Sequence, residues 1–274
     1  MVSLPPITIL GTGSMGGAIL SGLTGPDVAV DGRIRVTNRT VEKARPLSSA
    51  KVESFALAET PDANREAVRG ARVVLLGVKP AMVPELLREI AEDLDADAIV
   101  VSVAAGVTIA TMESLVSGSV LRAMPNTPAV VGKAVTGVAA GTRSNADELA
   151  VVRSLFETVG TVLEVPESKI DALGTISGSG PAYVFYFIEE LTRTAIELGF
   201  SADEAATMVN GTFQGAAELL VESGVAPGEL RRRVTSPKGT TERAIEVLQS
   251  ADLKSLFDRA TAAALARTKE LAAG

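Results

Sequence analysis

The chain has 274 residues, of which 46% are hydrophobic but only 3% aromatic, and its formal net charge is −7. This negative charge argues against nucleic acid or an anionic membrane as a general partner. The chain contains no cysteine and no histidine. Disulfides, thiolate metal sites and imidazole chemistry are therefore excluded, and we expect no metal site.

The N-terminal sequence MVSLPPITIL lacks the basic segment and apolar run of a signal peptide. The most apolar stretch, residues 98–110, is too short and too interrupted by Gly and Ser to span a bilayer. We therefore expect a soluble cytoplasmic protein.

The first 165 residues alternate short β-rich runs with helical patterns. Strands are predicted at 7–10, 34–38, 71–78, 98–103, 119–124 and 161–165, and helices at 14–23, 41–49 with a break at Pro46, 80–94 and 145–159. The run at 71–78 is apolar on both faces, which is typical of a central parallel strand. The alternation predicts an α/β domain with a parallel, doubly wound sheet over residues 1–165.

The second half, residues 166–274, reads as an all-α domain. Ser201 and Glu204 form the S-x-x-E pattern of a capping box ahead of a helix. Further helices are expected from Thr241 and from Asp252, which is a candidate helix cap. The sequence thus predicts two domains of different class.

One helix of the second half, residues 182–198, is apolar on nearly every side. A small helical domain cannot easily cover such a surface, so we expect this helix at a subunit interface. The alternative is a central helix buried within the chain's own bundle.

A glycine motif directly follows the first predicted strand. It reads Gly11-Thr12-Gly13-Ser14-Met15-Gly16, which is G-x-G-x-x-G between a strand and a helix. The first glycine permits the tight turn, the second lets the backbone approach a pyrophosphate, and the third lets the helix pack on the strand. The setting predicts a dinucleotide site.

The end of the second strand favours NADPH over NADH. An NAD site has an acid here for the ribose 2′-hydroxyl, whereas this chain has Asn38 and Arg39 and no acid. A guanidinium suits a 2′-phosphate. Two alternatives stay open: NADH as the cofactor, and Arg39 as a solvated surface residue.

Small or polar turns follow later strands at Gly77–Pro80, Ala104–Gly106 and Arg122–Pro128. Carboxyl ends of parallel strands meet at one sheet edge, where open α/β sheets bind ligands. These turns are therefore candidates for the rim of a cofactor cleft. The small residues at Ser177–Gly180 serve equally well for ligand approach or for helix packing.

Residues 234–244, VTSPKGTTERA, gather hydroxyls and a glycine before a helical pattern. Turn and cap formation is one interpretation of this stretch. The other is an anion site, because backbone N–H groups at a helix N-terminus are unpaired and favour negative charge.

Taken together, the segments ITILGTGSMGGAI, Asn38-Arg39, Asn64, GVKP, AAG, RAMPNTPA, SGSGPAYVF and VTSPKGTT resemble the pyrroline-5-carboxylate reductase family. The resemblance covers nearly the whole chain. It implies a Rossmann-type N-terminal domain and an all-α C-terminal dimerisation domain. It also implies reduction of 1-pyrroline-5-carboxylate to L-proline with NADPH or NADH, and assembly into dimers or a decamer.

The resemblance also implies roles for individual residues. Thr241 is the candidate catalytic residue, placed near the substrate ring nitrogen, and the hydroxyl-rich loop binds the substrate carboxylate through Ser236, Gly239, Thr240 and Thr241. The cofactor cleft is expected to involve the glycine motif, Asn38 and Arg39, together with Asn64, Val78, Lys79, Pro80, Ala105 and Gly106. Lys238 departs from the family's S-P-G-G loop: it is strained if the position needs a positive φ, and otherwise adds a cation near the carboxylate.

The expected reaction is hydride transfer to a C=N carbon. Water can protonate an imine before it binds, so a chain without histidine is adequate, and the enzyme's task is positioning. Two alternatives remain. A 3-hydroxyacid dehydrogenase would need a lysine on a helix of the second domain, yet residues 166–237 contain only Lys169. The other is a catalytically silent NADPH-binding regulator.

Overall fold

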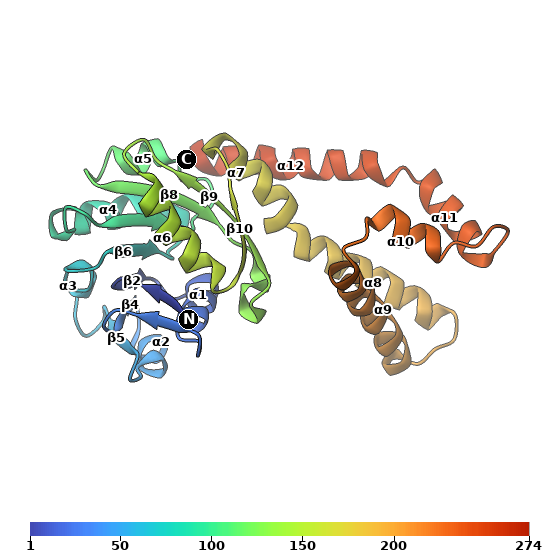
Figure 1. Ribbon diagram of the computed structural model, residues 1–274, viewed down its shortest axis with the longest axis horizontal. Helices are drawn as coiled ribbons and strands as arrows, with labels where there is room; N and C mark the ends of the chain where they lie inside the picture. Colours follow the sequence, from blue (N-terminus) through green and yellow to red (C-terminus); the bar gives the residue numbers. More distant parts are fainter. Residues whose placement is uncertain (274) are drawn as a thin grey trace. The chain divides into compact units, whose positions relative to one another are not determined.

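A computed structural model describes residues 1–273, with side chains through residue 270. The chain forms two compact units (Figure 1). The first comprises residues 1–179 and the end of the chain from Ala264, and the second comprises Gly180–Ala263. This division lies beyond the sequence-based boundary after residue 165, because α7 (Glu167–Leu173) packs on the sheet and buries Ile170 fully.

The first unit is built on an eight-stranded sheet of order β10-β9-β8-β7-β6-β2-β4-β5, beside a two-stranded sheet of β1 and β3. All pairs are parallel except β8 with β9, so the predicted parallel-type sheet is confirmed as mostly parallel. The strands are β1 (Val2–Leu4), β2 (Ile7–Leu10), β3 (Val28–Val30), β4 (Ile34–Asn38), β5 (Val52–Ala56), β6 (Val73–Leu76), β7 (Ile99–Ser102), β8 (Ser119–Met124), β9 (Ala134–Ala140) and β10 (Gly160–Glu164).

Helices cover both faces of this sheet. They are α1 (Ser14–Leu23), α2 (Val41–Ala44), α3 (Ala63–Val68), α4 (Val83–Ile90), α5 (Ile109–Glu113), α6 (Ala146–Glu157) and α7. Apolar residues of α1 and α6 form one core cluster with the sheet, and those of α3, α4, α5 and α7 form the other. The result is a three-layer α/β unit.

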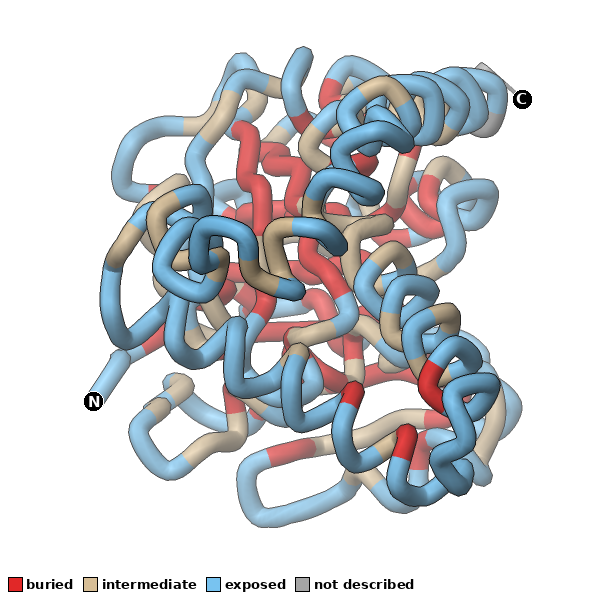
Figure 2. The backbone as a smooth tube through the Cα atoms, turned by 90° about the vertical axis from the view of Figure 1, so that its right-hand side faces the viewer, coloured by how far each residue is buried: buried red, intermediate tan, exposed pale blue. Residues whose placement is uncertain are grey.

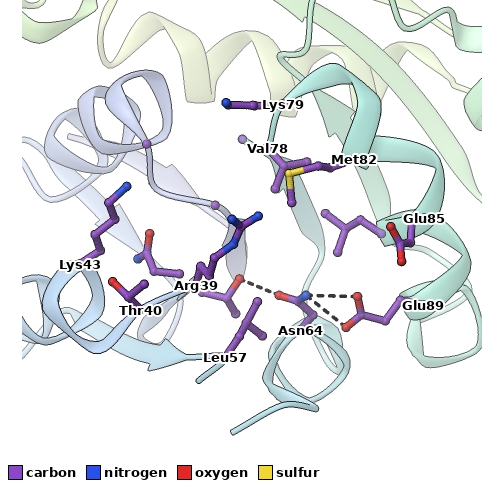
Figure 3. A pocket seen from close by; sticks show the side chains of 16 residues that line it. Arg39, Thr40, Lys43, Leu57, Asn64, Val78, Lys79, Met82, Glu85 and Glu89 are labelled. Carbon is purple, nitrogen blue, oxygen red and sulfur yellow. Dashed lines mark hydrogen bonds between the residues drawn. The ribbon is translucent and has the colours of Figure 1, made fainter. Parts of the chain in front are cut away.

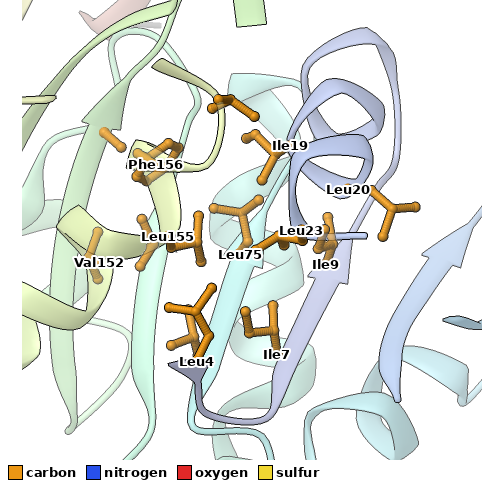
Figure 4. Close-up of a cluster of buried hydrophobic side chains, with 14 of the residues drawn as sticks. Leu4, Ile7, Ile9, Ile19, Leu20, Leu23, Leu75, Val152, Leu155 and Phe156 are labelled. Carbon is orange, nitrogen blue, oxygen red and sulfur yellow. The ribbon is translucent and has the colours of Figure 1, made fainter. Parts of the chain in front are cut away.

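The central strand β6 explains why its sequence is apolar throughout. Val73 and Leu75 belong to the first cluster, whereas Val74 and Leu76 belong to the second. Alternate side chains of a strand point to opposite faces, so a strand covered on both sides must be apolar at every position. Figure 4 shows the first cluster, in which Leu75 lies among side chains of α1 and α6.

The second unit is helical. It contains α8 (Gly180–Glu197), α9 (Ala202–Ser223), α10 (Pro227–Arg233), α11 (Thr240–Ser250) and the first part of α12 (Leu253–Ala273). The predicted capping box is present, because Ser201 and Glu204 each bond the other's backbone N–H. Asp252 caps α12, since its Oδ1 accepts a 3.3 Å hydrogen bond from the Ser255 N–H.

The helix α8 is not buried inside the chain's own bundle, so that alternative is wrong. Of its residues only Ala195 is buried, while Phe185 is 65% and Tyr186 60% exposed. Most buried residues of the chain belong instead to the first unit (Figure 2). The apolar surface of α8 is therefore available to a partner.

Within residues 1–273, no helix is both long enough and apolar enough to cross a membrane.

Candidate active site

The glycine motif forms a tight loop between β2 and α1. Gly11 has φ +89°, and a Cβ at Gly16 would lie 2.5 Å from the Gly11 carbonyl oxygen. These two positions accordingly need glycine, one for conformation and one for packing. A Cβ at Gly13 would meet no heavy atom within 4 Å, which leaves open space in front of the α1 N-terminus. The unpaired N–H groups of a helix N-terminus favour an anion there.

A cavity of about 680 Å³ opens beside this loop (Figure 3). Its charged residues are three cations, Arg39, Lys43 and Lys79, and two acids on α4, Glu85 and Glu89. The remaining lining residues are Gly11, Gly13, Thr37, Asn38, Thr40, Leu57, Asn64, Gly77, Val78, Met82 and Leu86. We call it the first cavity.

A chain of hydrogen bonds fixes the base of the first cavity. The Thr37 hydroxyl donates to Asn64 Oδ1 at 2.7 Å, and Asn64 Nδ2 donates to both Glu89 oxygens at 3.1 and 3.3 Å. Thr37 and Asn64 are buried. Because both ends of the Asn64 amide have partners, its orientation is determined. Nearby, Asn38 Nδ2 donates to the Thr12 hydroxyl oxygen at 2.5 Å.

A second cavity of about 480 Å³ lies at the carboxyl ends of β7 and β8. Every residue that lines it belongs to the first unit. The lining residues are Met15, Ala105, Met124, Pro125, Asn126, Thr127, Asp171, Gly174, Thr175, Gly178, Ser179, Ala264, Arg267 and Thr268.

The rim of the second cavity is tied together by a buried amide. Asn126 Nδ2 donates to the Ser177 carbonyl oxygen at 3.0 Å, and its Oδ1 accepts from the Val135 N–H at 2.9 Å. The hydrogen bond to Ser177 joins the turn after β8 to the short π-helix at Gly174–Gly178. The small residues of that turn thus have a packing role as well as a place on a cavity wall.

The structure gathers most of the predicted cofactor residues in these two cavities. Met15 and Ala105 line the second cavity, while Gly11, Gly13, Asn38, Arg39, Asn64, Val78 and Lys79 line the first. Thr12, Ser14, Gly16, Pro80 and Gly106 line neither. Arg39 is exposed at the end of β4 and borders the first cavity.

Sequence reasoning missed several lining residues, notably Lys43 and Glu89 in the first cavity and Asp171 and Arg267 in the second. Lys43 and Glu89 lie on helices, and each reaches the cavity only through the way its helix packs. Their sequence surroundings resemble ordinary solvated helix faces, so no local motif marks them.

The predicted substrate loop lies in the second unit, between α10 and α11. Gly239 is the N-cap of α11, and its N–H donates to the Ser236 carbonyl oxygen at 3.0 Å. Thr240 and Thr241 are the first two residues of the helix. The four predicted substrate residues are therefore gathered at one helix N-terminus.

The structure shows which backbone conformation Lys238 adopts, which the sequence could not decide. Its φ is +62°, so this position does require a left-handed backbone. With Pro237 before it and the Gly239-to-Ser236 hydrogen bond across it, the turn matches type II, which favours glycine at this place. The Lys238 N–H also donates to Glu242 Oε2 at 2.8 Å.

A mostly parallel α/β sheet with a glycine loop, and with cavities along its carboxyl edge, is typical of the Rossmann-type dinucleotide-binding oxidoreductases. Comparison with known proteins agrees. Residues 6–106 match the family described as "NADP oxidoreductase coenzyme F420-dependent". Residues 167–271 match "Pyrroline-5-carboxylate reductase dimerisation".

Full-length relatives carry the same name. The chain is 41% identical to the pyrroline-5-carboxylate reductase of Corynebacterium melassecola, with 97% of this chain and 98% of the relative covered. It is 35% identical to the enzyme of the same name from Pseudomonas aeruginosa, with 99% of this chain and 98% of the relative covered. The solved structure of the Coxiella burnetii enzyme matches with a TM-score of 0.87 at 36% identity, over 97% of both chains. This chain belongs to the pyrroline-5-carboxylate reductase family.

Proposed function

We propose that the protein reduces 1-pyrroline-5-carboxylate to L-proline with NADPH, with NADH as the alternative cofactor. Near-complete coverage by relatives named pyrroline-5-carboxylate reductase is the observation that carries this proposal. The 3-hydroxyacid dehydrogenase and the silent regulator are not favoured, because the matched relatives are named as reductases of the pyrroline.

The residues of the first cavity fit a phosphorylated dinucleotide. Open space at Gly13 lets a pyrophosphate approach the α1 N-terminus, while Arg39, Lys43 and Lys79 supply positive charge. We assign the 2′-phosphate to Arg39 and the ribose to the buried Asn64 amide. The second cavity, which Met15 of the glycine motif lines, would hold the nicotinamide end.

When bound, the cofactor supplies a hydride from nicotinamide C4. The chain itself has three tasks in the proposed reaction. The loop from Ser236 to Thr241 holds the substrate carboxylate with N–H and O–H donors. The Thr241 hydroxyl orients the ring nitrogen, and the two cavities of the first unit orient the cofactor for transfer. Water protonates the imine, so no strong protein acid is required.

An activity assay tests the proposed function. NADPH oxidation should depend on pyrroline-5-carboxylate, and a panel of 3-hydroxyacids with NADP should give no comparable turnover. Proline as the product identifies reduction at the C=N bond. Nucleotide binding without turnover on either substrate class would support the silent regulator instead.

Thr241→Ala tests the proposed substrate loop. Loss of one positioned donor should lower kcat/KM by roughly 10- to 100-fold, corresponding to about 1.5–3 kcal/mol, with NADPH binding unchanged. A threonine that only stabilises the helix start predicts a lower Tm and nearly unchanged turnover. Thermal unfolding and steady-state kinetics of the same variant separate the two roles.

Self-association follows from the family, because the matched helical region is its dimerisation domain. We propose a dimer, or a decamer built from dimers, as the assembled form. We also retain residues 1–165 and 166–274 as the functional division, since the dimerisation match starts at residue 167. The cytoplasmic location, and the absence of nucleic acid and membrane partners, stay predictions.

A further inference from the structure

The second cavity contains a carboxylate that the proposed mechanism does not use. Asp171 lies on α7, its side chain is 30% exposed, and it borders the cavity. The other charged lining residue, Arg267, pairs with Glu270 at 2.6 Å. The positive charge of Arg267 is thus paired with the carboxylate of Glu270.

Asp171 is held by a fully buried guanidinium. Arg122 on β8 has a side chain that is only 2% exposed, and its Nη2 donates to Asp171 Oδ1. Its Nη1 lies 3.6 Å from Glu167 Oε1. The same Glu167 oxygen accepts a 2.6 Å hydrogen bond from the Ile109 N–H at the start of α5. Arg122 therefore ties α7 to β8 and, through Glu167, to α5.

This arrangement leaves one unit of negative charge beside the cavity. Two carboxylates face one guanidinium, whose Nε has no hydrogen-bond partner among the described residues. A buried arginine needs one carboxylate for neutrality. The cluster of Arg122, Glu167 and Asp171 therefore has a net charge of −1, and Asp171 is its member at the cavity wall.

We propose that Asp171 is an electrostatic residue of the hydride-transfer cavity, where its carboxylate favours the single positive charge that the reaction moves. This inference rests on the proposed function. The protonated substrate brings a positive C=N group. As the hydride leaves nicotinamide C4 and bonds to the C=N carbon, that charge passes to the nicotinamide ring. A carboxylate fixed in the wall of this cavity would favour the cation before and after transfer.

The proposal predicts a preference between the two redox forms of the cofactor. The oxidised nicotinamide is positive and the reduced one is neutral, so Asp171 should favour NADP⁺ specifically. Asp171→Asn keeps the shape and the acceptor for Arg122 but removes the charge. We expect the ratio Kd(NADP⁺)/Kd(NADPH) to rise about 3- to 10-fold, the size expected for one partly screened charge several ångströms away.

Asp97→Asn is the matched control. Asp97 pairs with Arg72 at 3.4 Å, but just before β7, at the opposite edge of the sheet from the cavity. Its loss should leave the Kd ratio unchanged. Asp171→Glu, which retains the charge, should also keep the ratio within about twofold of the unmodified protein even where kcat falls.

Equal Kd ratios in Asp171→Asn and the Asp97→Asn control would overturn the proposal. If Asp171→Asn does not fold, Thr268→Glu adds a carboxylate to the same cavity and should lower the ratio; an unchanged ratio there would also overturn it. Failure of the proposed function looks different. In that case the unmodified protein would not reduce pyrroline-5-carboxylate with NADPH.

Discussion

Lys238 carries a backbone conformation that suits glycine. A left-handed φ of +62° costs an L-residue roughly 1–2 kcal/mol, whereas glycine adopts it freely but gains entropy in the unfolded chain. Lys238→Gly should therefore raise the free energy of unfolding by about 0.5–1 kcal/mol, measured by urea denaturation. The hydrogen bonds that the backbone N–H groups of residues 238 and 239 donate are both kept.

Lys238→Ala is the control for the side chain. It removes the ammonium group but retains the strained φ, so it should not reproduce the stabilisation. A glycine variant less stable than the unmodified protein would mean that the lysine side chain itself holds the loop.

Arg39 is the residue that we expect to set the preference between NADPH and NADH. It borders the first cavity at the end of β4, where an NAD site has an acid. Arg39→Asp should lower the NADPH-to-NADH ratio of kcat/KM by about 10- to 100-fold, because a charge-assisted hydrogen bond worth roughly 1.5–3 kcal/mol is lost. Arg45→Asp, an exposed change of equal charge that does not border the cavity, should leave the ratio unaltered. An unmodified protein with equal kcat/KM for both cofactors would contradict the assignment.

Residues within a local motif could be predicted from the sequence, and residues that act through packing could not. The roles of Gly11 and Gly16 follow from their spacing, and the structure shows the turn and close approach they imply. Glu89 and Asp171 reach the cavities only because α4 and α7 pack on the sheet as they do. That packing depends on contacts distant in sequence, so no short pattern could reveal it.

At the scale of elements, the long and strongly patterned segments were predictable. The sequence predicted helix α1 and the strands β4 and β8 with their observed bounds. The strands β1 and β3 were missed because three residues carry too little periodicity. Strand β9 was missed because its sequence, AVTGVAA, is rich in Ala and Gly, which have low strand propensity.

Helix α3 is joined to the turn after α4 by a pH-sensitive ion cluster. Hydrogen bonds from Arg65 and then Arg69 hold the pKa of Asp93 below its ordinary value. The folded state thus binds the Asp93 proton less readily than the unfolded chain does. This contribution to stability is present above about pH 4 and is lost as the pH falls through the lowered pKa.

Asp93→Asn should remove that contribution. The variant should be less stable than the unmodified protein in urea at pH 7, and the gap should narrow as the pH is lowered toward 3. Glu92→Gln, which changes the neighbouring acid, should lower the stability at pH 7 by less than Asp93→Asn does. A gap for Asp93→Asn that is constant between pH 7 and 3 would show that charge is not the cause.

For the whole molecule, the helical unit has too little core of its own. Its buried apolar residues are Ala195, Ala205 and Val209, whereas large apolar side chains such as Phe185 and Leu198 are 65% and 75% exposed. An isolated folded unit seldom leaves so much apolar surface in water. The family's dimerisation match covers this region, so a second copy is the expected cover.

Phe185→Asp tests which surface the second copy covers. In a two-fold symmetric dimer each interface residue is buried twice, once in each copy. If each substitution removes about 2 kcal/mol of binding free energy, the total loss is about 4 kcal/mol, and the Kd of the dimer rises roughly a thousandfold. Light scattering at micromolar concentration should show the unmodified protein as a dimer or larger and Phe185→Asp shifted toward monomer. Leu163→Asp changes an exposed apolar residue of β10, outside the dimerisation match, and should leave the mass unchanged. A well-folded, unmodified monomer at that concentration would contradict the inference, because α8 would then be stable while facing solvent.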